Sequence, residues 1–175
     1  MTDKKTLHKC GHSFCAACID EAFKHQKKCT VCSQVYGPLI GNQPPGKMIL
    51  SHSSITLPGY ESCGGSIHIT YKFESGVQGP NHPNPGQRYS GITRYGYLPD
   101  NREGQKVLKL LRKAFDQKLI FTIGRSSTTG ANNVITWNNI HHKTNVTGGP
   151  TWFGYPDPNY LKRVQEELAA KGITE

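Results

Sequence analysis

Residues 10–32 read CGHSFCAACIDEAFKHQKKCTVC and hold five of the six cysteines in this 175-residue chain. Two ligands separated by one or two residues can bind one metal ion, because a tight turn brings both to the same side. Zinc takes four such ligands in a tetrahedron. Residues 1–9 carry charges but lack the apolar stretch of a signal peptide. Crowded cysteines in a chain without an export signal favour metal binding over disulfides, so we predict a zinc site.

The spacing Cys-x-His-x2-Cys-x2-Cys-x10-Cys-x2-Cys resembles a RING finger, in which ligand pairs interleave around two zinc ions. In that scheme one complete site consists of Cys10, His12, Cys29 and Cys32. Cys15 and Cys18 belong to the second zinc, whose other two cysteines are expected upstream. Residues 1–9 contain no cysteine, as in a chain that begins within the finger. His8 is an alternative ligand there, although a surface histidine is the simpler interpretation.

A stretch rich in glycine and proline, residues 37–46, follows the cysteines and is typical of a connector. We therefore expect two domains. The first is a partial RING finger over residues 1–40 with a short helix at 19–28, and the second covers residues 41–175. The second domain mixes strand and helix patterns, so the predicted fold class is α+β.

Residues 67–73 alternate apolar and polar side chains, as a half-buried strand does. Residues 92–98, 119–123 and 134–137 are further strand candidates.

Two helices are expected in the second domain. Asp100 and Glu103 form a D-x-x-E capping box before the first. Its apolar residues recur at i, i+3, i+4, i+7 and i+8 over residues 107–115, which gives one buried stripe. The second helix is expected to have Asp157 at its N-cap and Gly172 past its end.

Short motifs spread over nearly the whole chain resemble the Deltex family of ubiquitin ligases. No single one is specific, but together they are typical of the family's C-terminal domain. They are GNQP at 41–44, HPNPG at 82–86, YLPD at 97–100, IFTIG at 120–124, IHHKT at 140–144 and GYPDPNYL at 154–161.

The resemblance implies a division of labour. The RING would dock a ubiquitin-conjugating enzyme charged with ubiquitin, and the C-terminal domain would bind NAD or ADP-ribose. That domain would support ADP-ribosylation of ubiquitin's C-terminal carboxylate and ubiquitylation of ADP-ribosylated proteins. The family also implies an intracellular setting, cytoplasmic or nuclear, and a link to Notch signalling.

The candidate functional residues of the second domain follow from this resemblance. The predicted catalytic residues are His141 and Glu167, with Glu167 as a general base on a ribose hydroxyl. Independently, residues 124–130 form a glycine-bounded turn whose backbone N–H groups can approach phosphates. The residues predicted to bind the nucleotide are Arg125, Ser126, Ser127, Trp137, His141, His142, Phe153 and Tyr155. The simpler alternatives are an ordinary turn, a solvent-exposed arginine, core aromatic residues and a solvated acid on a helix.

Two departures from the family pattern bear on activity. The half-missing zinc site takes with it the apolar loop by which a RING grips its conjugating enzyme, so ligase activity of this chain is in question. Phe153 stands where relatives often have histidine or tyrosine, and a phenyl ring cannot exchange a proton.

The net charge of +9 leaves a third class open beside ligase and non-catalytic ADP-ribose reader. A basic chain can bind nucleic acid, although a solvated surface explains the charge as well. No apolar run approaches the roughly 18 residues of a membrane span, so we expect no membrane partner.

Overall fold

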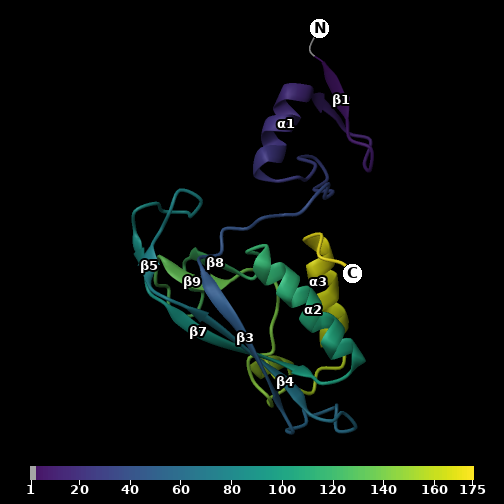
Figure 1. Ribbon diagram of the computed structural model, residues 1–175, viewed down its shortest axis with the longest axis vertical. Coiled ribbons are helices and arrows are strands. Elements are labelled where there is room, and N and C mark those ends of the chain that lie inside the picture. The colour runs from purple at the N-terminus through teal and green to yellow at the C-terminus, as the bar shows by residue number, and fades with distance from the viewer. Residues whose placement is uncertain (1–2) are drawn as a thin grey trace. The chain divides into compact units, whose positions relative to one another are not determined.

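The computed structural model describes residues 3–175, and the chain divides into two compact units, Met1–Ile40 (unit 1) and Gly41–Glu175 (unit 2). Helices and small sheets occur together, which confirms the predicted α+β class (Figure 1). Each unit has its own core and is described separately.

Unit 1 consists of a short hairpin and one helix. β1 (Lys4–Thr6) pairs antiparallel with β2 (Ser13–Cys15), and α1 (Ala16–His25) follows directly. The helix begins and ends three residues before the predicted span of 19–28. The buried apolar core of this unit is small, with Leu7, Ile19 and Cys29 at its centre.

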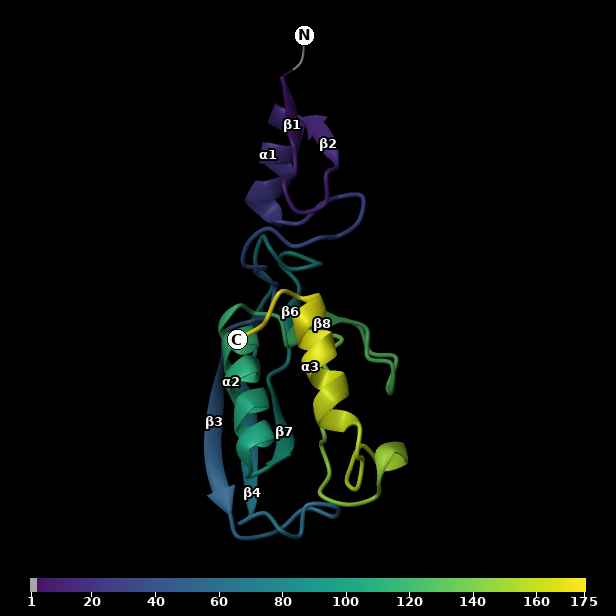
Figure 2. The ribbon, with the colours of Figure 1, turned by 90° about the vertical axis from the view of Figure 1, so that its right-hand side faces the viewer.

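Unit 2 is built on a three-stranded antiparallel sheet in the order β3 (Gly46–Ser53), β4 (Ser66–Phe73) and β7 (Ile92–Pro99). The predicted strands at 67–73 and 92–98 are confirmed, whereas β3 was not predicted. Residues 67, 69, 71 and 73 of β4 are buried, as its alternation requires. α2 (Arg102–Asp116) and α3 (Tyr160–Ala170) pack side by side on one face of this sheet (Figure 2).

The apolar stripe of α2 is confirmed, but its predicted capping box is wrong. Asn101 is the N-cap, and its side chain accepts a hydrogen bond from the Gly104 N–H at 2.7 Å. Asp100 lies one residue further out and accepts from Gln105 Nε2 instead. The amide oxygen of asparagine caps a helix as well as the carboxylate of aspartate does, so the sequence alone allowed either Asp100 or Asn101 as the N-cap residue.

The start of α3 also differs from the prediction. Asn159, not Asp157, is the N-cap residue, and the Asp157 side chain is engaged in the ion pairs described below. The end of the helix is as predicted. Gly172 has a φ of 76°, a left-handed conformation that glycine adopts without steric cost.

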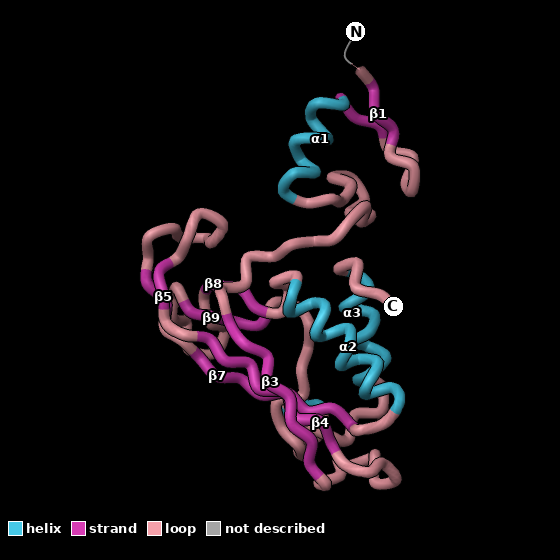
Figure 3. Tube along the Cα trace, in the orientation of Figure 1, coloured by secondary structure: helices cyan, strands magenta, loops and turns pink. Residues whose placement is uncertain are grey.

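Loops and two small hairpins fill the segments between β4 and β7 and between α2 and α3 (Figure 3). β8 (Phe121–Gly124) and β9 (Val134–Trp137) form a hairpin close to the predicted strands. β5 (Gly76–Val77) pairs with β6 (Arg88–Tyr89), and the 3-10 helix η1 (Pro150–Trp152) interrupts the long segment before α3.

Among residues 3–175, no helix is both long enough and apolar enough to cross a membrane.

Candidate functional site

Four predicted zinc ligands meet in unit 1: Cys10, His12, Cys29 and Cys32. One ligand atom from each lies within 4.8 Å of all the others, and His12 Nδ1 is 3.6 Å from Cys29 Sγ. Ligand atoms about 2.1–2.3 Å from a tetrahedral zinc ion stand roughly 3.5–3.8 Å apart. The three-cysteine, one-histidine set therefore fits zinc with only a small closure, which supports the predicted site.

Tyr36 forms hydrogen bonds to a ligand of this cluster, and the sequence patterns did not predict this role of Tyr36. Its hydroxyl donates to Cys10 Sγ at 3.0 Å and accepts from the backbone N–H groups of Lys9 and Cys10. A hydrogen bond to a ligand sulfur fixes the ligand's orientation. The only signal in the sequence was an aromatic residue four positions after Cys32.

Cys15 and Cys18 lie apart from the four-residue cluster. Cys15 precedes α1 and Cys18 is exposed on it. Within residues 3–175 they join no group of three or more metal-ligating side chains. His8 is exposed and its ring packs edge-on against Tyr36, as a surface histidine would.

A cleft of about 420 Å³ in unit 2 brings together five of the residues predicted to bind nucleotide. The predicted residues in its lining are Ser127, Trp137, His141, His142 and Phe153. They come from the β8–β9 turn, from β9, from the segment after β9 and from the end of η1. Thr128, Asn139, Ile140 and Thr144 complete the lining and were not predicted.

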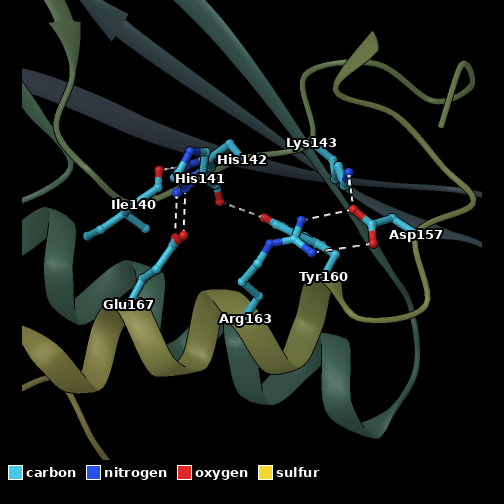
Figure 4. A network of polar contacts seen from close by, with 8 residues as sticks. All are labelled: Ile140, His141, His142, Lys143, Asp157, Tyr160, Arg163 and Glu167. Atoms are coloured by element: carbon cyan, nitrogen blue, oxygen red, sulfur yellow. Dashed lines mark hydrogen bonds and ion pairs between the residues drawn. The ribbon is translucent and has the colours of Figure 1, made fainter. Parts of the chain in front are cut away.

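His141 and Glu167 form the clearest polar pair at this cleft (Figure 4). His141 Nδ1 lies 2.5 Å from Glu167 Oε1, and the His141 backbone N–H donates to Glu167 Oε2 at 2.8 Å. The imidazole is 67% exposed, whereas the carboxylate is only 20% exposed and lies outside the cleft lining. His141 lines the cleft, whereas Glu167 contacts His141 from outside the lining. Both carboxylate oxygens of Glu167 bind His141, so Glu167 would act on a ligand through His141.

His142 is buried and belongs to the floor of the cleft. Its Nδ1 donates to the Ile140 carbonyl at 3.0 Å, so its Nε2 accepts from the Tyr71 hydroxyl at 2.7 Å. The ring stacks on Trp137 with centroids 4.5 Å apart. Gly96 makes room for it, because a Cβ there would lie 3.1 Å from His142 Cδ2. Burial lowers the pKa of His142 to about 4, which keeps the ring neutral.

Arg125 and Ser126 stabilise the β8–β9 turn and lie outside the cleft lining. Arg125 Nε donates to the Gly130 carbonyl at 3.2 Å, and Ser126 Oγ accepts from the Thr129 N–H at 3.1 Å. The predicted contacts of Arg125 and Ser126 with phosphate stay predictions.

The predicted ligand contact of Tyr155 requires correction. Tyr155 is fully buried, and its hydroxyl donates to the Tyr97 carbonyl at 2.7 Å. Phe153, by contrast, lines the cleft with a 59% exposed side chain and a left-handed φ of 55°. Its neighbour Trp152 is 69% exposed and lies outside the lining.

A larger groove of about 520 Å³ runs between α2, α3 and the residues that follow α3. Lys106 and Glu175 form an ion pair across it at 3.4 Å. Its charged lining has no histidine, cysteine or aromatic residue. The smaller cleft at His141 combines proton-transfer groups with stacking surfaces and is therefore the candidate site.

The sequence model of the Deltex C-terminal domain matches residues 40–173, which is most of the chain. The chain belongs to the Deltex family. The sequence model of the C3HC4 zinc finger, or RING finger, matches residues 1–32. Both findings confirm the resemblance inferred from the motifs.

Named Deltex relatives align over nearly the whole chain. It is 62% identical over 177 residues to "Probable E3 ubiquitin-protein ligase DTX3" of Homo sapiens, covering 100% of this chain and 51% of that protein. It is 46% identical to "E3 ubiquitin-protein ligase DTX4" of Mus musculus, covering 97% of this chain and 28% of that protein. This Deltex chain thus spans about half the length of the first relative.

The Deltex motif at 154–161 also contributes Asp157 to a charge cluster in which Lys143 and Asp157 are buried and Arg163 is partly exposed (Figure 4). Asp157 Oδ2 lies 2.6 Å from Lys143 Nζ and 2.9 Å from Arg163. Hydrogen bonds from Arg163 first, and then from Lys143, lower the pKa of Asp157 to about 2 against the opposing effect of burial. The cluster ties the IHHKT segment to the start of α3.

Proposed function

We propose that this chain is part of a RING-type ubiquitin ligase whose C-terminal domain binds ADP-ribose or NAD at the His141 cleft. From NAD bound there, the ADP-ribose group would pass to ubiquitin's C-terminal carboxylate, and nicotinamide would leave. An ADP-ribosylated protein bound there would instead accept ubiquitin on a ribose hydroxyl. The relatives' names support the ligase assignment. One of the family motifs, IHHKT at 140–144, supplies four of the nine residues that line the cleft.

The observation that carries the proposal is the His141–Glu167 pair at the wall of an aromatic cleft. Glu167 accepts from Nδ1, which leaves Nε2 of a neutral imidazole as a proton acceptor towards the cleft. A ribose hydroxyl beside Nε2 would lose its proton to His141 as its oxygen attacks the thioester of a charged conjugating enzyme. The enzyme's thiolate then leaves.

The rest of the lining suits a nucleotide. Trp137 and the neutral His142 offer stacked rings to a ribose or a base, and burial in a cleft strengthens such contacts. Ser127 and Thr128 bring hydroxyl groups from the β8–β9 turn, where phosphate oxygens would find donors.

The RING contribution rests on unit 1. Its four-ligand cluster would hold zinc, and Val31, between the last two ligands, is 66% exposed. An exposed apolar residue beside the metal suits a contact with a conjugating enzyme.

Calorimetric titration of ADP-ribose and NAD tests the proposal directly. His141→Ala should weaken binding by about 1–3 kcal/mol, the range for removing one partner of a desolvated hydrogen bond. His52→Ala is the matched control, since His52 is a largely exposed histidine of unit 2 outside the cleft. Normal ADP-ribose affinity in a folded His141→Ala chain would contradict the assigned cleft.

Phe153 favours a second candidate, a reader that binds ADP-ribose without chemistry, because its ring offers no proton. A ubiquitin discharge assay, in a chain extended to a complete RING, separates reader from ligase. In that chain Phe153→His should raise ubiquitin transfer to ADP-ribose, with an affinity change below about tenfold. Nucleic-acid binding, which only the net charge favours, would reveal itself by a steep loss of affinity with salt.

A further inference from the structure

The segment that carries His141 lies outside every strand and helix. On either side, the Asn138 N–H donates to the Ile120 carbonyl at 2.9 Å, and the Lys143 carbonyl accepts from the Tyr97 N–H at 2.9 Å. The backbone groups of His141 itself are bound by side chains of α3 instead. A residue held in this way depends on those side chains for its position.

Two side chains of α3 form hydrogen bonds to the backbone N–H and C=O of His141 (Figure 4). Glu167 Oε2 accepts from the N–H at 2.8 Å, and the Tyr160 hydroxyl donates to the C=O at 2.9 Å. Tyr160 and Glu167 are seven residues apart, two helical turns, so they lie on the same face of α3.

Tyr160 is suited to hold a fixed position. It is 1% exposed, and its ring packs against Tyr155 and beneath the ammonium of Lys143, 5.2 Å from the ring centroid. Burial raises the pKa of Tyr160 well above its ordinary value, so its hydroxyl remains a proton donor at every working pH. Phenylalanine would keep the ring and remove the hydroxyl that donates to the His141 carbonyl.

We propose that Tyr160 is a positioning residue that sets the orientation of the His141 imidazole towards the cleft. The imidazole is largely exposed, so few packing contacts fix it. Its orientation depends on the 2.5 Å contact between Nδ1 and Glu167, and that contact depends on where the peptide is held. Release of the carbonyl lets the peptide rotate and frees Nδ1 from the carboxylate.

The predicted signature is the tautomer of His141. With Glu167 accepting from Nδ1, the neutral ring carries its proton on Nδ1, whereas a free imidazole in water exchanges between both tautomers. Long-range ¹H–¹⁵N NMR of the ligand-free chain in mildly alkaline buffer reads the two ring nitrogens. A His141→Gln chain identifies the His141 signals by their loss.

Tyr160→Phe should convert His141 from a single Nδ1–H tautomer to a mixture. Tyr155→Phe is the matched control, because Tyr155 is equally buried and its hydroxyl donates to the Tyr97 carbonyl instead. Tryptophan fluorescence on heating establishes that both chains are folded. An unchanged His141 spectrum in Tyr160→Phe, or an equal change in both variants, overturns the proposal.

A second measurement needs no substitution. In the unmodified chain, the Tyr160 hydroxyl proton should exchange slowly with water and show a nuclear Overhauser contact to His141. Rapid exchange without that contact would overturn the proposal even if Tyr160→Phe fails to fold.

The consequence for activity rests on the proposed function. Tyr160→Phe should lower the rate of ubiquitin transfer to ADP-ribose by about tenfold, the value of one hydrogen bond, while ADP-ribose affinity changes less. The NMR result needs no ligand, so the two ideas fail separately. An altered tautomer in a chain that binds no ADP-ribose sustains the role of Tyr160 and overturns the proposed ligand.

Discussion

Units 1 and 2 keep their folds in different ways. The buried core of unit 1 is Leu7, Ile19 and Cys29, and one of these three is a zinc ligand. Unit 2 packs two helices on a sheet around fully buried residues such as Tyr71 and Leu111. Units of about 40 residues cannot bury enough apolar surface and usually need a metal or disulfides. The metal is thus part of the core in unit 1, whereas unit 2 is stabilised by its own side chains.

The two units also differ in what their converging polar side chains bind. Within residues 3–175 every buried side-chain nitrogen and oxygen has a hydrogen-bond partner. In unit 2 these partners are other residues, as in the Lys143–Asp157 pair, whose side chains are 4% and 5% exposed. In unit 1 the four ligand side chains converge on one point, where a metal ion supplies the partner that they share.

Removal of zinc gives the largest expected effect. Structural zinc contributes about 10–16 kcal/mol to small zinc domains. A strong chelator should therefore unfold unit 1 completely and collapse the dispersion of its amide NMR signals. Both tryptophans, Trp137 and Trp152, belong to unit 2, so their fluorescence should stay unchanged.

Native mass spectrometry should find one tightly bound zinc per chain, and Cys63→Ser, outside unit 1, is the control that retains it. Two zinc ions in each monomer would contradict the single site. Loss of the tryptophan signal upon chelation would show that unit 2 also depends on the metal.

The sequence predicted the elements of unit 2 wherever one face of an element is buried. β4 and the stripe of α2 follow their periods closely, because burial selects apolar residues at fixed spacing. β3 was missed because it is an edge strand with most of its side chains exposed, among them Ile49 and Leu50, and therefore shows no alternation. Caps failed by one or two residues, since Asn and Asp satisfy the same local pattern.

Asp157→Asn should produce the second largest effect, a loss of about 3–5 kcal/mol in the free energy of unfolding of unit 2. The buried Lys143 ammonium would remain without its counter-charge, which costs more than the pair itself contributes. Urea unfolding followed by tryptophan fluorescence measures this change.

Asp100→Asn is the matched control for Asp157→Asn. Asp100 hydrogen-bonds to the largely exposed His52 at 3.0 Å, and exposed contacts of this kind contribute less than about 1 kcal/mol. Equal effects of the two substitutions would contradict the idea that the buried pair stabilises unit 2.

His142 should give unit 2 a smaller, pH-dependent change in stability. Its folded pKa of about 4 lies below the ordinary value of 6.5, so the unfolded chain binds the proton more tightly. Stability should therefore be complete above about pH 6.5 and fall as the pH drops towards 4, by up to roughly 1.4 kcal/mol per pH unit.

The difference between wild type and His142→Asn in urea unfolding isolates this effect. His142→Asn removes the titrating ring, so its stability should vary less steeply between pH 6.5 and about 4. Parallel curves for the two chains would show that His142 does not titrate with unfolding.

The candidate site was predicted less completely than the fold. His141 and Glu167 were found through motifs, but a sequence does not show that both carboxylate oxygens bind the histidine. Tyr155 was predicted to contact the nucleotide but is buried in the core, because aromatic residues occur both in cores and in ligand sites. Tyr36 and Tyr160 act through single hydroxyl contacts across the fold, which leave no periodic signal in the sequence.

The smallest expected effect is on ADP-ribose affinity when residues 1–40 are deleted. Every residue that lines the His141 cleft belongs to unit 2, whose core includes no residue of the zinc cluster. The dissociation constant measured by calorimetry should therefore change by less than about twofold, or ~0.4 kcal/mol. Chelation of the intact chain is the companion measurement, because it unfolds unit 1 without shortening the chain. A several-fold loss in both would mean that unit 1 contributes contacts to the nucleotide site. A loss upon deletion alone would point to the shortened chain end, since residues 41–44 bond to α2 and β8 through the Gln43 side chain.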